Sequence, residues 1–211
     1  MFAETMLVDR TRRVRWIVAA GIVAAMATSA LAAPKVVNPS FEADRFGTFP
    51  GSAKLNGGKI QGWTFSGGVG LDPTWKDCVA RSGPTHTFND NGITPDGEQV
   101  AVLHGRATLS QRVDGFVAHK RYRVTFYENA RRNSRSKEPP LLEVTLGGAT
   151  VVSTHRVTPV ERADFHTLPY HFVESAVFEA PQSGAQELVF KASLNAGVAV
   201  LIDKVSIDEV Q

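Results

Sequence analysis

Val36-Val37-Asn38-Pro39-Ser40-Phe41-Glu42 is the stretch from which the fold prediction starts. It follows a segment that is typical of an export signal. Beyond it, the chain continues as short runs of alternating apolar and polar residues that glycine and proline separate. Such runs are typical of strands joined by turns. We therefore expect Val36 to Glu42 to form the first strand of a β-sandwich.

The segment before this stretch has the three parts of a secretory signal. An apolar run over residues 16–27 and small residues ending at Ala32 follow a basic start with Arg10, Arg12, Arg13 and Arg15. We predict a signal peptide over residues 1–32 and one β-sandwich domain over residues 33–211. A membrane anchor is the alternative, but a span needs roughly 20 apolar residues. The pair Arg12-Arg13 leaves the twin-arginine export route open.

The predicted mature part has no net charge. The chain has 23 Lys and Arg and 21 Asp and Glu; four of the basic and two of the acidic residues precede residue 33, which leaves 19 of each sign. Binding of nucleic acid through bulk charge is not indicated. An exported protein, periplasmic or extracellular, with Cys78 as its one cysteine cannot close an internal disulfide. We expect Cys78 to be a small buried group.

The clearest alternation runs from Tyr122 to Asn129. It predicts a strand with Tyr122, Val124 and Phe126 on one side and Arg123, Thr125, Tyr127 and Asn129 on the other. Further strands are expected at Ile60 to Phe65, Gln99 to Leu103, Thr108 to Val113, Leu142 to Leu146, Val151 to Thr154, His171 to Phe178, Glu187 to Ala192 and Val198 to Ile207. Gly147-Gly148 predicts a hairpin turn, and the apolar last strand is expected to be central. No segment shows a convincing capped helix. The prediction is an all-β protein, an antiparallel β-sandwich of jelly-roll type.

Six short motifs in a fixed order carry a resemblance to a known fold family: Asn38–Glu42, Ile60–Trp63, Pro95–Gln99, Leu109–Gln111, Tyr122–Phe126 and Leu201–Ile207. In this order they resemble the galactose-binding-like jelly rolls. These include carbohydrate-binding modules of families four and nine and related exported domains of unknown function. The resemblance covers nearly all of residues 33–211. It indicates the fold and leaves the ligand open, because function varies widely within such folds.

The resemblance implies that the first and last strands lie side by side and that Glu42 and Asp203 help to hold a structural calcium ion. Calcium takes several oxygen ligands from carboxylates and carbonyls, and carbonyls of the loop after Glu42 are available to complete the set. The alternative is that Glu42 caps a turn and Asp203 accepts backbone hydrogen bonds. Lys204 stands where asparagine is frequent in the motif, and its charge argues against a cation there.

Sugar-binding sites combine aromatic rings with a few polar side chains. Trp75 lies in a polar stretch that we expect to be a loop, which makes it a candidate ligand-binding residue. Tyr127 and Asn129 lie on the polar side of their predicted strand; an ordinary solvated face is the alternative. Trp63 is expected to lie in the core.

A basic cluster comprises Arg131, Arg132, Arg135 and Lys137. Arginines pair carboxylates or sulfates through two hydrogen bonds, so Arg131 and Arg132 are candidate contacts to an acidic polysaccharide. A solvated loop tip is the alternative. Glu128 and Glu143 are expected to be surface carboxylates and not a catalytic pair, whose separation no sequence shows. The histidines lack metal-ligand spacing, and there is no nucleophile elbow.

The sequence therefore predicts an exported, non-catalytic β-sandwich that binds a polysaccharide or another cell-envelope glycan, with no nucleic acid as partner and no membrane span in the mature form. Two alternatives stay open. One is a structural or assembly protein of the envelope that acts through protein–protein contacts, for which an exposed apolar patch or sheet edge would be the sign. The other is a polysaccharide hydrolase or lyase on the same fold.

Overall fold

The structure is a computed structural model that describes residues 33–46, 51–54, 57–83, 91–131, 138–159, 166, 168–193 and 198–211. For Trp75 and Ser82 it describes the backbone alone. The chain divides into two units, residues 1–30 and residues 31–211, and the fold below is that of the second unit. The predicted signal peptide and its cleavage site at Ala32 lie outside the described residues. None of the described helices is long and apolar enough to cross a membrane.

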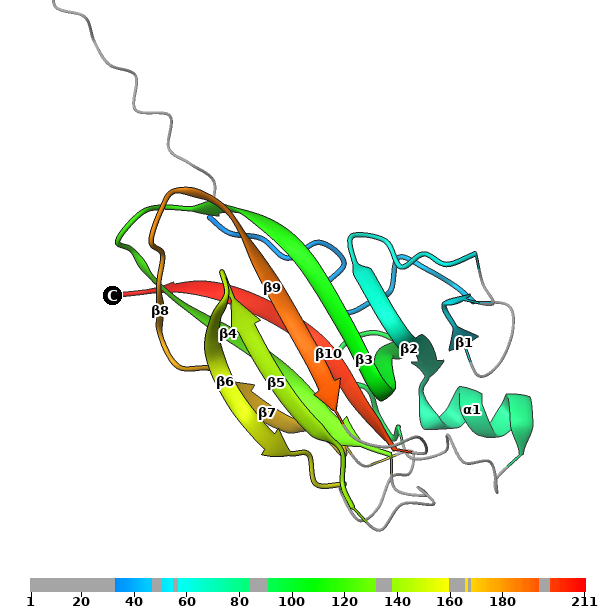
Figure 1. Cartoon of the computed structure of the whole chain (residues 1–211). Helices are drawn as coiled ribbons and strands as arrows, with labels where there is room; N and C mark the ends of the chain where they lie inside the picture. The colour runs from blue at the N-terminus through cyan, green and yellow to red at the C-terminus, as the bar shows by residue number, and fades with distance from the viewer. Residues whose placement is uncertain are drawn as a thin grey trace, which may run out of the picture. The chain divides into compact units, whose positions relative to one another are not determined.

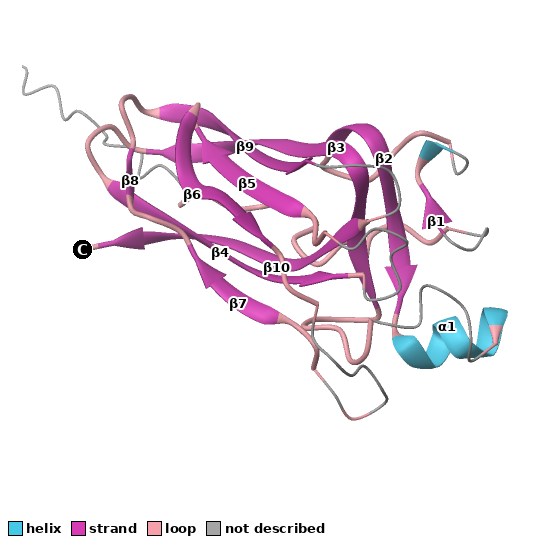
Figure 2. Cartoon of the chain, turned by 60° about the horizontal axis from the view of Figure 1, so that its bottom comes forward, coloured by secondary structure: helices cyan, strands magenta, loops and turns pink. Residues whose placement is uncertain are grey.

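The second unit is an antiparallel β-sandwich of jelly-roll type, as predicted (Figure 1). Strand pairing runs in the order β6-β5-β9-β3-β10-β4-β7, with β2 beside β3, β1 beside β2 and β8 beside β4. The strands are β1 Gly51–Ser52, β2 Thr64–Pro73, β3 Gln99–Phe116, β4 Arg121–Ala130, β5 Leu141–Leu146, β6 Ala149–Arg156, β7 His171–Glu174, β8 Phe178–Glu179, β9 Gly184–Ser193 and β10 Ala199–Val210. One helix, α1 Trp75–Ser82, follows β2 among the described residues (Figure 2).

The long strand β3 belongs to both layers of the sandwich. Its first part pairs with β10 and its second part, from Ala107 to Phe116, pairs with β9, while β2 pairs with both parts. The register against β2 shifts between Gly67 and Gly68, which leaves Gly105 and Arg106 of β3 without a partner in this pairing. Gly67 has a positive φ, and a Cβ there would lie 2.2 Å from the carbonyl oxygen of Arg106. Glycine is therefore needed where the sheet bends from one layer into the other.

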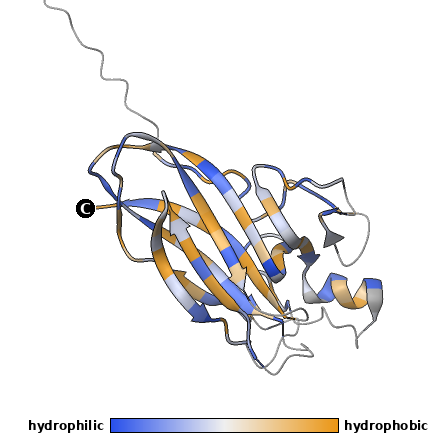
Figure 3. Cartoon of the chain, viewed as in Figure 1, coloured by the Kyte–Doolittle hydropathy of each residue, from blue (hydrophilic) through white to orange (hydrophobic). Residues whose placement is uncertain are grey.

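Alternation places the core as predicted (Figure 3). Tyr122, Val124 and Phe126 on β4 are fully buried and belong to one cluster with residues of the facing layer. Trp63 is also in this core, with its ring 5.3 Å from that of Phe41 and 6.2 Å from that of Phe190. The β5–β6 hairpin at Gly147-Gly148 and the central position of β10 between β3 and β4 confirm two further predictions. Cys78 is buried, as expected.

The prediction of a first strand at Val36 to Glu42 is wrong. The segment is a turn in which Asn38 and Phe41 both have positive φ. Proline has no N–H to donate to a strand ladder, and asparagine tolerates the left-handed backbone region, so Asn38-Pro39 ends extended pairing. The predicted neighbour, Leu201 to Ile207, pairs with β3 and β4 instead. One backbone hydrogen bond joins the two segments, from Val205 N to Pro39 O at 3.0 Å.

The prediction that Trp75 lies in a loop is also wrong, because Trp75 begins α1. Thr74 caps the helix by accepting a hydrogen bond from Asp77 N, Asp77 lies in the first turn and Arg81 in the last. The signal was present in the sequence: Thr74 and Asp77 have the spacing of a capping box, and both charges suit the helix dipole. The helix is short enough that its apolar periodicity alone does not reveal it.

Candidate functional site

The outer face of β2, β3, β10 and β4, the face turned away from the core, carries a row of polar and apolar side chains. Residues directly opposite each other on paired strands share a face. His104 lies opposite Gly68 on one side and Ala199 on the other, and Arg131 N donates to Ala199 O at 3.0 Å. These pairs place His104 and Arg131 along one line across the sheet.

Two further rows run parallel to this one. Leu201 lies opposite both Val102 and Asn129. Tyr127 lies opposite Asp203 on one neighbour and Phe172 on the other. Three of the predicted ligand-binding residues therefore lie on one face, as alternation requires: Tyr127 and Asn129 on β4, and Arg131 directly after its end. Their cross-strand neighbours come from positions far away in the sequence.

A small apolar cluster forms the floor of the outer face. It comprises Val100, Val102, Tyr170, Ala199 and Leu201, and Tyr127 packs against it. It is separate from the main core, which lies on the other side of the same strands. An apolar floor with polar groups around it is the usual construction of a small-molecule site.

A cavity of about 230 Å³ opens at the β2 side of this face, lined by Gly51, Ser52, Gly68, Val69, Gly70, Asp72, Val102 and His104. The backbone of β1 passes so close that a Cβ on Gly70 would lie 2.4 Å from the Gly51 oxygen. Burial, with a smaller effect of the Arg131 charge, lowers the pKa of His104. A neutral imidazole can donate one hydrogen bond and accept another, which suits a hydroxyl-rich ligand.

Aromatic rings occupy the opposite side of the face. The ring of Phe172 is 5.2 Å from that of Tyr127 at an angle of 56°. Phe172 is 55% exposed, an unusual state for so large an apolar side chain. The exposed Lys204 places its Nζ 6.0 Å from the Tyr127 ring centroid. Phe172 was not among the predicted site residues, because only the pairing of β7 with β4 brings it beside Tyr127.

The other predicted ligand-binding residues differ in accessibility. Asn129 was expected on an exposed polar side but is 1% exposed, and its Oδ1 accepts a hydrogen bond from Ala130 N at 2.8 Å. Arg131 is partly buried. Arg132 lies outside the described residues, as does the side chain of Trp75. The accessible part of the face is therefore formed by His104, Tyr127 and Phe172 more than by Asn129.

Asp203 is fully buried, and backbone amides already use both of its oxygens. Asp96 N donates to Oδ2 at 2.9 Å and Lys204 N to Oδ1 at 2.7 Å. Burial raises the pKa of Asp203 to about 8, and the nearby carboxyl groups of Asp96 and Glu42 add to this effect. Below that pH the group is mostly protonated, so it is a neutral acid on the row that contains Tyr127.

Glu42, the other predicted calcium ligand, is also engaged. Its Oε1 accepts hydrogen bonds from Glu98 N at 2.8 Å and Gln99 N at 2.9 Å. The side-chain amide of Gln99 donates to the carbonyl oxygens of Phe41 and Asp44, at 2.5 and 2.6 Å. These contacts match the alternative in which Glu42 and Asp203 hold backbone amides. A calcium ion at this place would compete with these amides for the same oxygens, so calcium stays a proposal.

Glu128 was expected to be a surface carboxylate, and this prediction is wrong. Glu128 is 5% exposed, and both of its carboxylate oxygens lie 2.9–3.0 Å from His155 Nε2 on β6. Burial raises the pKa of Glu128, and the hydrogen bond from His155 opposes part of that rise. Glu128 lies two residues after Phe126, on the inward side of β4, so alternation places it toward the core. Its partner His155 comes from β6, which no local pattern shows.

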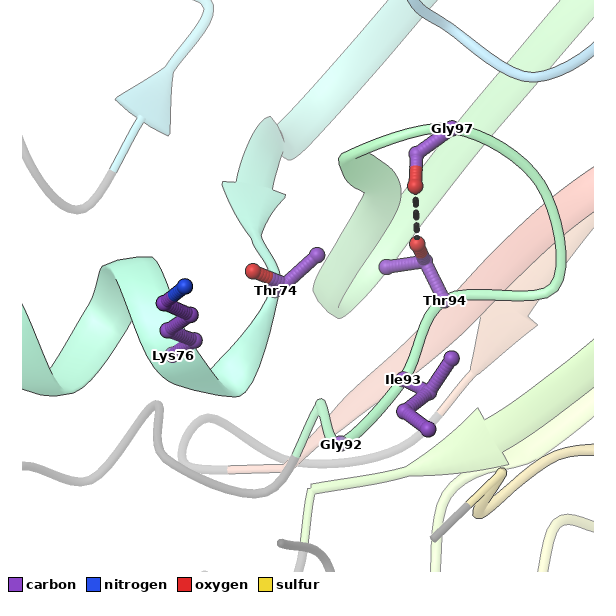
Figure 4. A pocket seen from close by; sticks show the side chains of 6 residues that line it. All are labelled: Thr74, Lys76, Gly92, Ile93, Thr94 and Gly97. Carbon is purple, nitrogen blue, oxygen red and sulfur yellow. Dashed lines mark hydrogen bonds between the residues drawn. The ribbon is translucent and has the colours of Figure 1, made fainter. Parts of the chain in front are cut away.

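A second cavity of about 540 Å³ lies between the start of α1 and the loop before β3, lined by Thr74, Lys76, Gly92, Ile93, Thr94 and Gly97 (Figure 4). The Thr94 hydroxyl donates to Gly97 O at 2.7 Å and so serves the loop itself. Among the described residues of this lining there is no aromatic ring, and Lys76 is the one charged group. Within the described part of the chain, no three His, Cys, Asp or Glu side chains gather closely enough to hold a metal ion.

Comparison with known families identifies the chain. The family model "HpiC1-like: HpiC1 cyclase" matches residues 32–208, almost the whole second unit. The chain belongs to the HpiC1-like family. A search of curated proteins finds no match.

Solved structures that resemble the chain include carbohydrate-binding modules, in line with the motif series. One is TmCBM61 in complex with β-1,4-galactotriose (TM-score 0.47, 15% identity, covering 79% of this chain and 100% of the other). Another is the CBM22-1 xylan-binding domain from Paenibacillus barcinonensis Xyn10C (TM-score 0.44, 19% identity, covering 72% and 88%). TM-scores below 0.5 are too low for a comparison of ligand sites, so the site above rests on this chain's own geometry.

Proposed function

We propose that this member of the HpiC1-like family is an exported, non-catalytic protein that binds a glycan of the cell envelope on its outer face. One observation carries the proposal: strand register brings Tyr127 and the exposed Phe172 together on a face whose other side carries His104. The apolar faces of sugar rings pack on aromatic side chains, while hydroxyls need neutral donors and acceptors. Export rests on the signal-like residues 1–32.

Binding of the purified chain to an array of neutral and acidic glycans tests the proposal. Phe172→Ala should weaken binding about tenfold, since a lost ring contact is worth roughly 1.4 kcal/mol. Ile93→Ala is the matched control, because Ile93 is 42% exposed but lines the cavity at α1. If Ile93→Ala abolishes binding and Phe172→Ala does not, the site lies at α1. If the chain binds no glycan, the proposal is wrong.

A second candidate function is catalysis of a cyclisation, which the description of the family suggests. The observation in its favour is Asp203, whose pKa is raised to about 8 and which lies opposite Tyr127. A carboxyl group that stays protonated at neutral pH is able to act as a general acid. Incubation with the substrate of an HpiC1-like cyclase, followed by chromatography, would test it. Product formation by the parent that Asp203→Asn removes would favour catalysis over simple binding.

The predicted structural calcium at Glu42 and Asp203 is kept as a proposal. Its support is electrostatic, because Glu42 and Asp96 both raise the pKa of Asp203 and a divalent cation would relieve this repulsion. The backbone amides that occupy the same oxygens stand against it. Calcium titration followed by thermal unfolding separates the two: a bound ion raises the unfolding temperature, and the rise grows with the logarithm of the calcium concentration above the dissociation constant.

A further inference from the structure

Lys204 has a backbone conformation that lysine rarely adopts. Its φ is 50°, in the left-handed region that glycine and asparagine enter more easily. It lies in an irregularity of β10, where the register against β4 shifts between Asp203 and Ser206. Such bulges re-aim side chains and occur often beside functional sites. A costly backbone conformation at a bulge makes Lys204 a candidate for a functional role.

The bulge places the Lys204 cation at the aromatic side of the outer face. Nζ is 6.0 Å from the centroid of the Tyr127 ring, and that ring is 5.2 Å from Phe172. Tyr127 is only partly covered and Phe172 is 55% exposed. The exposed lysine therefore lies next to a ring surface on which a ligand can pack.

The charge of Lys204 is not cancelled by its neighbours. Among the described residues it forms no ion pair, whereas the nearby Glu174 pairs with Arg123 and Asp208 accepts a hydrogen bond from Ser206 at 2.7 Å. Asp203, the preceding residue, turns both oxygens toward backbone amides. A positive charge beside an apolar platform, with the local acids already engaged, is complementary to a ring that carries a negative charge.

We propose that Lys204, Tyr127 and Phe172 form a subsite for an anionic sugar ring, one that carries a carboxylate or a sulfate. The proposal rests on the glycan-binding function proposed above and specifies its substrate class as acidic. The aromatic rings take the apolar face of the sugar, and the Lys204 ammonium pairs with the acidic substituent.

The test compares acidic oligosaccharides with neutral partners of the same shape. Oligomers of galacturonate, glucuronate and mannuronate, each with its methyl ester, and sulfated oligosaccharides with their unsulfated parents are titrated by calorimetry at low and high salt. We expect the acid to bind about three- to fivefold more tightly than its ester, as one partly exposed ion pair implies, and salt to reduce this preference.

Lys204→Asn removes the charge while keeping a residue that tolerates the left-handed backbone. It should abolish the preference by lowering the affinity for the acid to that for its ester; Lys204→Gly checks the same result with a different backbone. Lys191→Gln, at an exposed lysine on β9, is the control and should keep the preference. Phe172→Ala should weaken acid and ester alike.

Each outcome decides one of the two proposals. Equal binding of acid and neutral forms, or a preference that survives Lys204→Asn, overturns the acidic subsite and leaves glycan binding in place. Binding of no saccharide, acidic or neutral, overturns the proposed function and the subsite with it. A preference for one kind of acidic group, carboxylate or sulfate, that depends on Lys204 supports the subsite and identifies the substituent.

Discussion

Asp203 and Glu128 are two buried carboxyl groups that the fold accommodates in different ways. Both are at least 95% buried, and burial is the main cause of the raised pKa of each. Backbone amides of Asp96 and Lys204 hold Asp203, whereas the imidazole of His155 holds Glu128. One carboxyl group thus has partners that cannot titrate, and the other has a partner that can.

The neighbouring charges also differ in sign. Asp96 and Glu42 raise the pKa of Asp203, while His155 and His171 act to lower that of Glu128. Similar burial therefore leads to a neutral acid near pH 7 in one place and to a carboxyl group that shares a hydrogen bond with an imidazole in the other. The difference teaches that the state of a buried carboxyl group depends on which elements the fold brings against it.

The largest effect is expected from Asp203→Ala. The change leaves two buried amides without their acceptor, which should lower the free energy of unfolding by about 2–4 kcal/mol. Urea denaturation measures the loss. Asp208→Ala on the same strand is the control, because Asp208 is exposed and a loss within about 0.5 kcal/mol is expected there. Equal losses in both variants would contradict the importance of the amide contacts.

The second-largest effect is expected in the pH dependence of stability, which should distinguish Asp203 from Glu128. In the unfolded chain an aspartate loses its proton near pH 3.8, whereas folded Asp203 keeps it to about pH 8. The folded state therefore binds the proton more tightly, and the Asp203 contribution to stability falls as pH rises from about 4 to about 8.

Thermal unfolding of the parent and of Asp203→Asn across this range measures the effect. The variant cannot titrate at this position, so the parent should lose stability relative to it on going from pH 5 to pH 8. A constant difference between the two proteins would show that the pKa of Asp203 is not raised. Bound calcium would favour the carboxylate and reduce the difference in slope.

A smaller effect is expected where the partner is a side chain. His155→Ala should cost about 1–3 kcal/mol, because it leaves the buried Glu128 without its hydrogen bond. Once Glu128→Gln has removed the charge, the same change should cost about 1 kcal/mol less, which a double-mutant cycle by urea denaturation measures. His171→Ala is the control, since His171 is exposed and lies opposite Glu128. A cycle that closes to zero would show that Glu128 and His155 do not interact.

Strand β4 shows how far the sequence predicts the site. Alternation correctly assigns Tyr122, Val124 and Phe126 to the core and puts Tyr127 and Asn129 on the other face. It also places Glu128 on the inward side, two residues after Phe126, but it does not show that Asn129 is covered. Alternation reports only to which side a residue points, whereas burial depends on what lies on that side.

The remaining parts of the candidate site depend on contacts between distant segments. Phe172 joins Tyr127 through β7, and Lys204 reaches the same ring through a bulge in β10. The local sequence does contain the signal for the turn at Asn38-Pro39, namely a proline next to a residue that tolerates positive φ. The apolar residues before it favoured the strand prediction. The Thr74–Asp77 cap of α1 is also local, but the helix that follows it is too short for its apolar periodicity to predict it.

The sequence by itself determined the all-β class, the glycine turns, the inward residues of each strand and the central place of β10, because backbone preference and alternation are local properties. The tertiary structure alone decided which strands are neighbours and in what register. His104, Leu201 and Asn129 share a face with Phe172 and Lys204 only after pairing across long stretches of chain. Pairing is selected by burial of the whole core, so the site is a property of the assembled sandwich and of no single stretch.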